Sequence, residues 1–141
     1  MSKKVVSNPG NEAGERRVLV VEDNVDAADT MQLILKISGY EARTAHDGAS
    51  AVRIAREFQP QVVFLDIGLP GKDGYQVARE LRGLPQMQSA FLVALTGYGH
   101  DDDRRRANEA GFNAFQVKPV APEALDQLLK GHFDSAKSAD R

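Results

Sequence analysis

The chain has 141 residues, of which 42% are hydrophobic and 27% charged, a composition typical of one globular domain with its own core. Lys and Arg number 18 against 20 Asp and Glu, and this net charge of −2 argues against a nucleic-acid partner held by bulk electrostatics. The absence of cysteine excludes disulfides, thiolate nucleophiles and cysteine-ligated metals, and it fits the reducing cytoplasm, where we expect the protein.

The two ends of the chain differ in composition from its middle. Residues 1–16, MSKKVVSNPGNEAGER, are polar, are interrupted by Pro and Gly, and lack the apolar core of a signal peptide. No later run reaches the length of a transmembrane helix, so we expect no membrane insertion. We predict a flexible leader or linker over 1–16, one domain over 17–131 and a flexible tail over 132–141.

Five runs rich in β-forming residues follow one another along the chain. They cover residues 18–21, 41–45, 62–65, 91–95 and 114–117. The first, third and fourth runs (VLVV, VVFL and FLVAL) are continuous rather than alternating. Continuous apolar runs are expected of central strands that are covered on both faces.

Helical patterns with recognisable ends separate these runs. We predict helices over residues 25–38, 49–58, 75–84, 101–110 and about 122–130. Asn24, Asp47 and Asp73 are positioned to cap the first three helices. Gly39 ends the first helix, and Pro122 suits the first turn of the last. The strict alternation of strands and helices predicts an α/β fold, with a doubly wound parallel sheet and right-handed crossovers.

Polar side chains follow four of the predicted strands. Glu22 and Asp23 come after the first strand, and Asp66 comes after the third. Thr96 follows the fourth strand and Lys118 the fifth. The carboxyl ends of parallel strands lie on one edge of a sheet, where ligands bind near the point at which the strand order reverses. If the first and third strands are neighbours, three carboxylates meet in one pocket beside a hydroxyl and an ammonium group.

Each of these residues also has a purely structural interpretation. Glu22 and Asp23 can complement the dipole of the helix that follows them, and Asp66 can form a turn. Thr96 can act as a cap, and Lys118 can lie in a solvated turn. Their conjunction at four separate strand ends favours a functional site.

Two further polar features receive a structural interpretation only. Residues 101–106, DDDRRR, are typical of acids at a helix start followed by a solvated face. His46, His100 and His132 lack the spacing of metal ligands, so we do not expect a histidine metal site.

The chemistry of clustered carboxylates suggests a purpose for the strand ends. Such groups repel one another unless a cation balances them, and hard oxygen ligands with open water positions suit Mg²⁺. An acid held beside that ion can attack phosphorus and form an aspartyl phosphate. Lys118 would pair with the phosphoryl oxygens, and Thr96 would donate a hydrogen bond to one of them. In this interpretation Glu22 and Asp23 hold the metal.

Four segments of the chain carry a resemblance to a known family. The pieces VLVVEDN, FLDIGLPGKDGY, ALTGYG and FQVKPV, in this order and over about residues 17–130, resemble the receiver domain of two-component response regulators. The resemblance implies a flavodoxin-like three-layer (βα)5 sandwich with the strand order 2-1-3-4-5. It also implies a role for each residue that matches a family motif.

The resemblance implies a phosphoacceptor and a metal site. Asp66 corresponds to the phosphoacceptor and is also a metal ligand. Asp23 corresponds to the direct Mg²⁺ ligand, and Glu22 acts through water. The backbone carbonyl of Gly68 completes the protein's share of the metal shell, with Mn²⁺ as an alternative ion.

The resemblance further implies a conformational switch. Thr96 and Lys118 respond to the phosphoryl group, and the peptide bond between Lys118 and Pro119 is expected to be cis. Phe115 matches the aromatic switch residue, but it has no hydroxyl group, so the switch must act by packing.

Three residues near the expected site leave the lifetime of the phosphorylated form unspecified. Gly97 follows Thr96 where alanine is common, and Gly68 places no side chain over the site. Tyr98 lies two residues after Thr96, at a position that helps to set the dephosphorylation rate in the family.

The implied function is regulatory, because the only catalysis of such a domain is its own phosphorylation and dephosphorylation. A histidine kinase or a histidine phosphotransfer protein would donate the phosphoryl group. A downstream protein would bind the face formed by residues 101–110, 114–117 and 122–130. The sequence leaves no room for an output domain after residue 131, so we expect a stand-alone regulator or a receiver excised from a hybrid kinase.

Two other classes of protein remain as alternatives. One is a Mg²⁺-dependent aspartyl-phosphate phosphohydrolase of the haloacid-dehalogenase kind. That class carries D-x-D after its first strand, whereas this chain has E-D-N at residues 22–24. The other is a pseudo-receiver, a module for protein interaction that is not phosphorylated. Such a module would be expected to lose acids or the lysine, and this chain keeps them.

Overall fold

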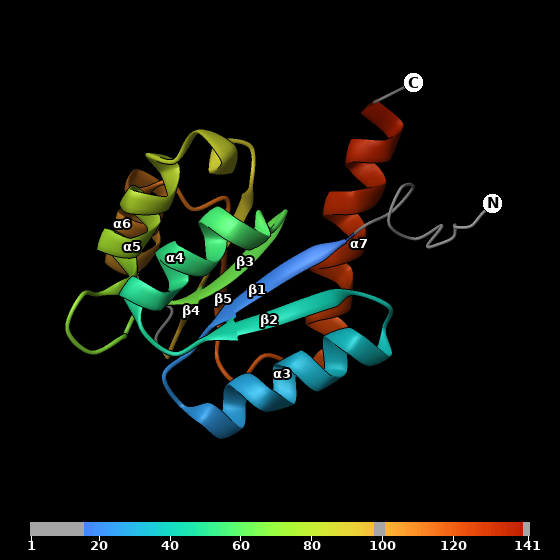
Figure 1. Ribbon diagram of the computed structural model, residues 1–141, viewed down its shortest axis with the longest axis horizontal. Coiled ribbons are helices and arrows are strands. Elements are labelled where there is room, and N and C mark those ends of the chain that lie inside the picture. The colour runs from blue at the N-terminus through green and yellow to red at the C-terminus, as the bar shows by residue number, and fades with distance from the viewer. Residues whose placement is uncertain (1–15, 98–100, 140–141) are drawn as a thin grey trace.

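A computed structural model describes residues 16–97 and 101–139 of the chain, and five strands alternate with five α-helices in it (Figure 1). The strands are β1 (Arg17–Val21), β2 (Glu41–Ala45), β3 (Val62–Asp66), β4 (Phe91–Thr96) and β5 (Ala114–Val117). The helices are α3 (Val25–Ile37), α4 (Gly48–Phe58), α5 (Gly74–Arg82), α6 (Asp101–Ala110) and α7 (Pro122–Ala139), with a short 3-10 helix at Pro85–Met87. Every predicted strand and helix is present.

The five strands form one parallel sheet with the order β2-β1-β3-β4-β5. Helices α4, α5 and α6 cover one face of this sheet, while α3 and α7 cover the other (Figure 1). The predicted doubly wound α/β fold and the strand order 2-1-3-4-5 are therefore confirmed.

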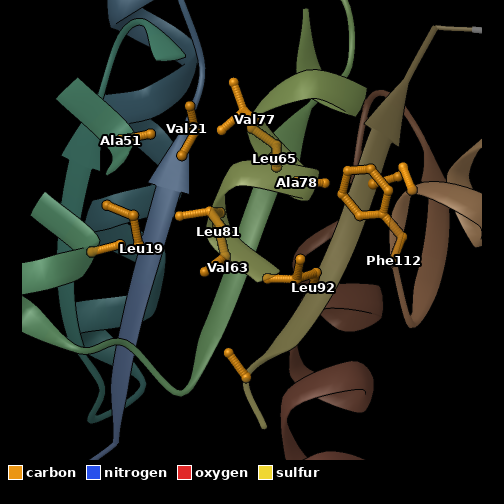
Figure 2. Close-up of a cluster of buried hydrophobic side chains, with 14 of the residues drawn as sticks. Leu19, Val21, Ala51, Val63, Leu65, Val77, Ala78, Leu81, Leu92 and Phe112 are labelled. Atoms are coloured by element: carbon orange, nitrogen blue, oxygen red, sulfur yellow. The ribbon is translucent and has the colours of Figure 1, made fainter. Parts of the chain in front are cut away.

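Successive residues of each central strand enter opposite halves of the core. In β1, Leu19 and Val21 pack under α4 and α5, whereas Val18 and Val20 pack under α3 and α7. All four side chains are fully buried. Figure 2 shows the first of these two clusters, with side chains from the sheet meeting those of α4 and α5. Burial on both faces explains why the central strands are continuously apolar.

The predicted helix caps are confirmed. The side chain of Asn24 accepts a hydrogen bond from the Ala27 amide at 2.9 Å and begins α3. Asp47 begins α4 in the same way, by accepting from the Ser50 amide at 2.8 Å. Asp73 forms a reciprocal capping box with residue 76 at the start of α5. Each cap satisfies amide groups that a helix start would otherwise leave unpaired.

The last helix is longer than the sequence predicts. The expected end near Lys130 is wrong, because α7 continues to Ala139 and includes residues that we assigned to a tail. Tertiary contacts stabilise this extension: the His132 ring stacks on Phe91 at 4.9 Å, and Phe133 stacks on Tyr40 at 5.9 Å. Residues 1–15 of the predicted leader and residues 140–141 lie outside the described residues.

Three smaller observations complete the comparison with the sequence. Helix α5 ends at Arg82 rather than at residue 84, because the chain continues into the unpredicted 3-10 helix. The peptide bond between Lys118 and Pro119 is cis, as expected. Within the described residues, no helix combines the length and the apolar character that a bilayer crossing requires.

Candidate functional site

The residues predicted for the site meet at one edge of the sheet. Asp66 and Thr96 are the last residues of β3 and β4, while Glu22 and Lys118 directly follow β1 and β5. The neighbouring pairs β1–β3, β3–β4 and β4–β5 bring these strand ends together. Asp66, Thr96 and Lys118 line a cavity of about 530 Å³, and Asp23 lies in its wall as well. We refer to this space as the acidic pocket.

Three carboxylates lie together at the acidic pocket, and two of them, Asp23 and Asp66, line its wall. Oxygen atoms of Glu22, Asp23 and Asp66 lie within 4.8 Å of one another. Glu22 and Asp66 are only 3% and 5% exposed, whereas Asp23 faces solvent. Burial raises the pKa of Glu22; the Asn24 amide, 3.1 Å from its carboxylate, opposes this shift, and the charge of Asp66 adds to it. The pocket therefore holds negative charge against an energetic cost.

Lys118 partly balances this charge. Its ammonium nitrogen lies 3.0 Å from Oδ2 of Asp66 and 3.2 Å from Oε1 of Glu22. Burial lowers the pKa of Lys118, but the hydrogen bonds and charges of Asp66 and Glu22 outweigh burial and raise it overall. Lys118 consequently stays charged at neutral pH, and it contacts two of the three clustered acids.

The backbone around Asp66 fixes the position of its carboxylate. Oδ1 of Asp66 accepts a hydrogen bond from the Gly68 amide at 2.8 Å, so both carboxylate oxygens have a donor. The start of α5 packs directly against this loop at Gly74. A Cβ atom at Gly74 would lie 2.4 Å from the Ile67 Cα and 2.6 Å from the Asp66 carbonyl oxygen. Only glycine allows so close an approach.

The donor set fits a hard divalent cation. Three carboxylates within reach of one another supply oxygen ligands, and Lys118 leaves much of their charge unbalanced. Gly68, whose carbonyl is predicted to join the metal shell, lies in the wall of the same pocket. Buried acids at this spacing are stabilised when a cation enters. These residues therefore suit Mg²⁺.

Thr96 and Phe115, the two residues predicted to act as a switch, lie in different surroundings. Thr96 is buried in the wall of the acidic pocket, and its backbone carbonyl accepts from the Lys118 amide at 2.7 Å. Phe115 is half-buried against the core, and the Arg104 guanidinium lies over its ring at 4.8 Å. The structure thus brings Thr96 into the site and places Phe115 against α6. Tyr98 lies outside the described residues.

Four further polar residues of the pocket wall were not predicted to belong to the site. They are Asp73, which caps α5, Tyr75 in the first turn of α5, and Asp103 and Arg106 in the first two turns of α6. Topology could have indicated them, because the helices that follow β3 and β4 begin at the same edge of the sheet where these strands end. The structural interpretation of residues 101–106 as a solvated face is therefore incomplete.

The acids of this chain are arranged differently from those of a phosphohydrolase of the D-x-D kind. That class needs two acids after its first strand, but the second position here is Asn24, whose side chain caps α3. The buried acid with two hydrogen-bond donors is Asp66, at the end of β3. A buried carboxylate held in one orientation beside a lysine is suited to act as a nucleophile toward phosphorus.

Comparison with known proteins agrees with this geometry. The family model of the response regulator receiver domain matches residues 18–130. A putative response regulator from Chloroflexus aurantiacus is 30% identical, with a TM-score of 0.77 over 82% of this chain and 95% of that one. A chemotaxis protein of Vibrio cholerae is 26% identical, with a TM-score of 0.79 over 82% of this chain and 96% of that one.

A third similar structure contains a bound metal ion. The receiver domain of a sensor histidine kinase from Pseudomonas aeruginosa is 30% identical, with a TM-score of 0.75 over 82% of this chain and 94% of that one. Its structure contains a magnesium ion coordinated in the active-site cleft. The acidic cluster of this chain has the ligand chemistry for the same kind of ion.

Proposed function

This chain belongs to the family of response-regulator receiver domains of two-component systems, and we propose that it accepts a phosphoryl group on Asp66 in the presence of Mg²⁺. The observation that carries the proposal is the surroundings of this carboxylate. Asp66 is buried, its oxygens have Lys118 and the Gly68 amide as donors, and two further acids lie beside it.

The reaction is a transfer between a donor and one Asp66 oxygen. That oxygen attacks phosphorus, a new O–P bond forms, and the P–N bond of a phosphohistidine breaks while its imidazole takes up a proton. The ammonium nitrogen of Lys118 lies 3.0 Å from Oδ2 of Asp66 and would pair with the phosphoryl oxygens after the transfer. Thr96 would donate its hydroxyl to another of these oxygens. Glu22, Asp23, Asp66 and the Gly68 carbonyl would hold the metal ion, whose positive charge would offset the phosphoryl dianion.

The proposed consequence is a change of interaction surface. Thr96 and Lys118 would move toward the phosphoryl group, and Phe115 would repack as space opens beneath it. Since β5 carries Phe115 and leads to Lys118, the altered face would be that of α6, β5 and α7. A clear switch needs a difference of several kcal/mol, on the order of 5, between the two states. A histidine kinase or a histidine phosphotransfer protein would be the donor in the cytoplasm. Mn²⁺ would serve as an alternative to Mg²⁺ in the metal site.

The test is phosphorylation by acetyl phosphate, followed by intact mass. With Mg²⁺ we expect one phosphoryl group on the wild type, and none on Asp66→Asn or after addition of EDTA. Asp66→Asn should keep its fold by circular dichroism. Asp23→Asn should weaken Mg²⁺ binding by roughly tenfold or more in a calorimetric titration, because it removes a direct ligand. Persistent labelling of Asp66→Asn would disprove the assignment of the phosphoacceptor.

Two other outcomes would point to the alternative functions. Absence of both a phosphoryl adduct and beryllofluoride binding in the presence of Mg²⁺ would indicate a pseudo-receiver. Rapid, repeated release of phosphate from an excess of phosphorylated substrates would indicate a phosphohydrolase.

A further inference from the structure

The acidic pocket has a second cation that the reaction described above does not use. Arg106 of α6 lies in the pocket wall together with Asp66, Thr96 and Lys118. Lys118 is already engaged by two carboxylates. No ion pair of the Arg106 guanidinium is found within residues 16–97 and 103–134, whose side chains the structure describes; its contact is with the Tyr75 ring, at 4.3 Å. The charge of Arg106 is therefore available to an incoming anion.

Tyr75 gives Arg106 a fixed support. The Tyr75 side chain is only 5% exposed, its hydroxyl donates to the Asp103 carbonyl at 3.4 Å, and its ring packs edge-on against Phe112 at 6.5 Å. The preceding residue, Gly74, donates its amide to the Ile67 carbonyl at 3.2 Å, in the loop that follows Asp66. Arg106 thus stacks on a ring that is attached to the phosphoacceptor loop.

The three consecutive arginines of α6 differ in what they contact. Arg104 lies over Phe115, whereas Arg106 lies over Tyr75 and in the pocket wall. Asp103 and Arg106 are three residues apart and both line the pocket, as expected for one face of a helix. All three arginines are exposed, but Arg105 is absent from the residues that line this pocket. Only the third arginine of the run therefore belongs to the site.

The chemistry of a stacked arginine suits a phosphoryl group. A guanidinium that places one face on an aromatic ring keeps its N–H groups in the plane, where they can donate to two oxygens of one anion. The acids of the pocket repel such an anion, so a second cation matters for its binding.

We infer that Arg106 is a specificity-determining residue of the acidic pocket, which binds the non-bridging oxygens of the phosphoryl group in the donor complex and in aspartyl phosphate. This inference rests on the proposed function of the pocket. Arg106 would be a second cation beside Lys118, from a different element, and it would bind the phosphoryl group and not the leaving group.

The first measurement is the affinity for beryllofluoride, a mimic of the phosphoryl group, at saturating Mg²⁺. Arg106→Gln should raise the Kd for beryllofluoride about tenfold, because it loses one charge-assisted hydrogen bond. Arg106→Lys should lie between the wild type and Arg106→Gln, since it keeps the charge but loses the planar fork. The matched control is Arg105→Gln, on the same helix, which should change the Kd by less than about twofold.

Affinity for Mg²⁺ alone separates a binding role from a structural one. Loss of a cation should leave Mg²⁺ binding to Arg106→Gln unchanged or make it tighter, whereas a distorted pocket would bind both ligands more weakly. The rates of labelling by acetyl phosphate and by phosphoramidate should fall by the same factor, because the two donors share only the phosphoryl group. A fall with one donor alone would overturn the inference.

The outcomes distinguish this inference from the proposed function. If the wild type binds beryllofluoride and Arg106→Gln binds it equally well, the inference is wrong and the phosphoacceptor stands. If the wild type does not bind beryllofluoride at all, the proposed function fails and the inference fails with it.

Discussion

Two partly buried cations at opposite edges of the sheet have different kinds of partner. Lys118, at the carboxyl edge, contacts two carboxylates at 3.0 and 3.2 Å. Arg82, at the amino edge, donates to backbone carbonyls on either side of it, including Gly111 at 2.8 and 2.9 Å and Ala90 at 2.8 Å. It also donates to the Asn113 side chain at 2.7 Å.

The difference separates a cation whose partners can respond to a ligand from one whose partners cannot. Neutral carbonyls that face a guanidinium are fully satisfied by it and have no charge left for another ligand. Carboxylates that share one lysine keep unbalanced charge, so a metal ion or a phosphoryl group can change the arrangement. We therefore expect stability to depend on the amino edge and ligand binding to depend on the carboxyl edge.

The largest effect on stability should come from Arg82→Met. This change leaves several carbonyls at the start of β4 and β5 without their donor, and we expect a loss of about 3 kcal/mol in the free energy of unfolding. Urea denaturation measures this loss. Arg79→Met, an exposed position on the same helix, is the control and should cost less than about 0.5 kcal/mol. Equal stabilities of the two variants would contradict the structural role of Arg82.

Gly74→Ala should reduce both the stability of the fold and the binding of ligands. Its Cβ would lie 2.4 Å from the Ile67 Cα, so the loop after Asp66 must move at a cost of about 2 kcal/mol. Because that loop follows Asp66, the proposed phosphoacceptor, Mg²⁺ and beryllofluoride binding should weaken as well. The control is Gly131→Ala, where an added Cβ meets nothing within 4 Å and which should raise stability by up to about 1 kcal/mol. Normal ligand binding by Gly74→Ala would show that the loop tolerates the movement.

Local sequence signals were sufficient for most of the fold. Continuous apolar runs identified the central strands, and single acidic or amide residues such as Asn24 and Asp73 marked the helix starts. The end of α7 was missed because the contacts that extend the helix, of His132 with Phe91 and of Phe133 with Tyr40, involve residues distant in the sequence. Helix ends that depend on such contacts cannot be predicted from neighbouring residues.

The sequence located the three clustered carboxylates but not all the residues of the pocket wall. Glu22, Asp66 and Lys118 could be placed because each follows a strand, and parallel strands share one edge. Arg106 was not placed, because its position depends on the Tyr75 ring of another helix. The Arg82 contacts were missed for the same reason, since their acceptors come from separate loops.

A smaller effect should follow from Glu22→Gln in the metal-free protein. Burial raises the pKa of Glu22 in the folded state, so the folded protein holds the proton more tightly than the unfolded chain. Stability is therefore lost as pH rises from about 4.5 toward the folded pKa. The variant, which has no charge to bury, should be more stable than the wild type at pH 7 and should bind Mg²⁺ more weakly. Denaturation at several pH values with EDTA checks this; lower stability of the variant at pH 7 would contradict it.

The smallest effect on stability should come from His132→Phe at the amino edge, with a pH dependence opposite to that of Glu22→Gln. His132 is partly buried against Phe91, and burial lowers its pKa below the ordinary value of 6.5. The unfolded chain therefore takes up the proton first, and stability is lost as pH falls from 6.5 toward the folded pKa. His132→Phe should remove this acid loss and keep the stacking on Phe91. The two variants then differ in sign: Glu22→Gln gains stability over the wild type as pH rises from 4.5, and His132→Phe gains as pH falls below 6.5. Unchanged acid sensitivity of His132→Phe would mean that α7 opens before this histidine titrates.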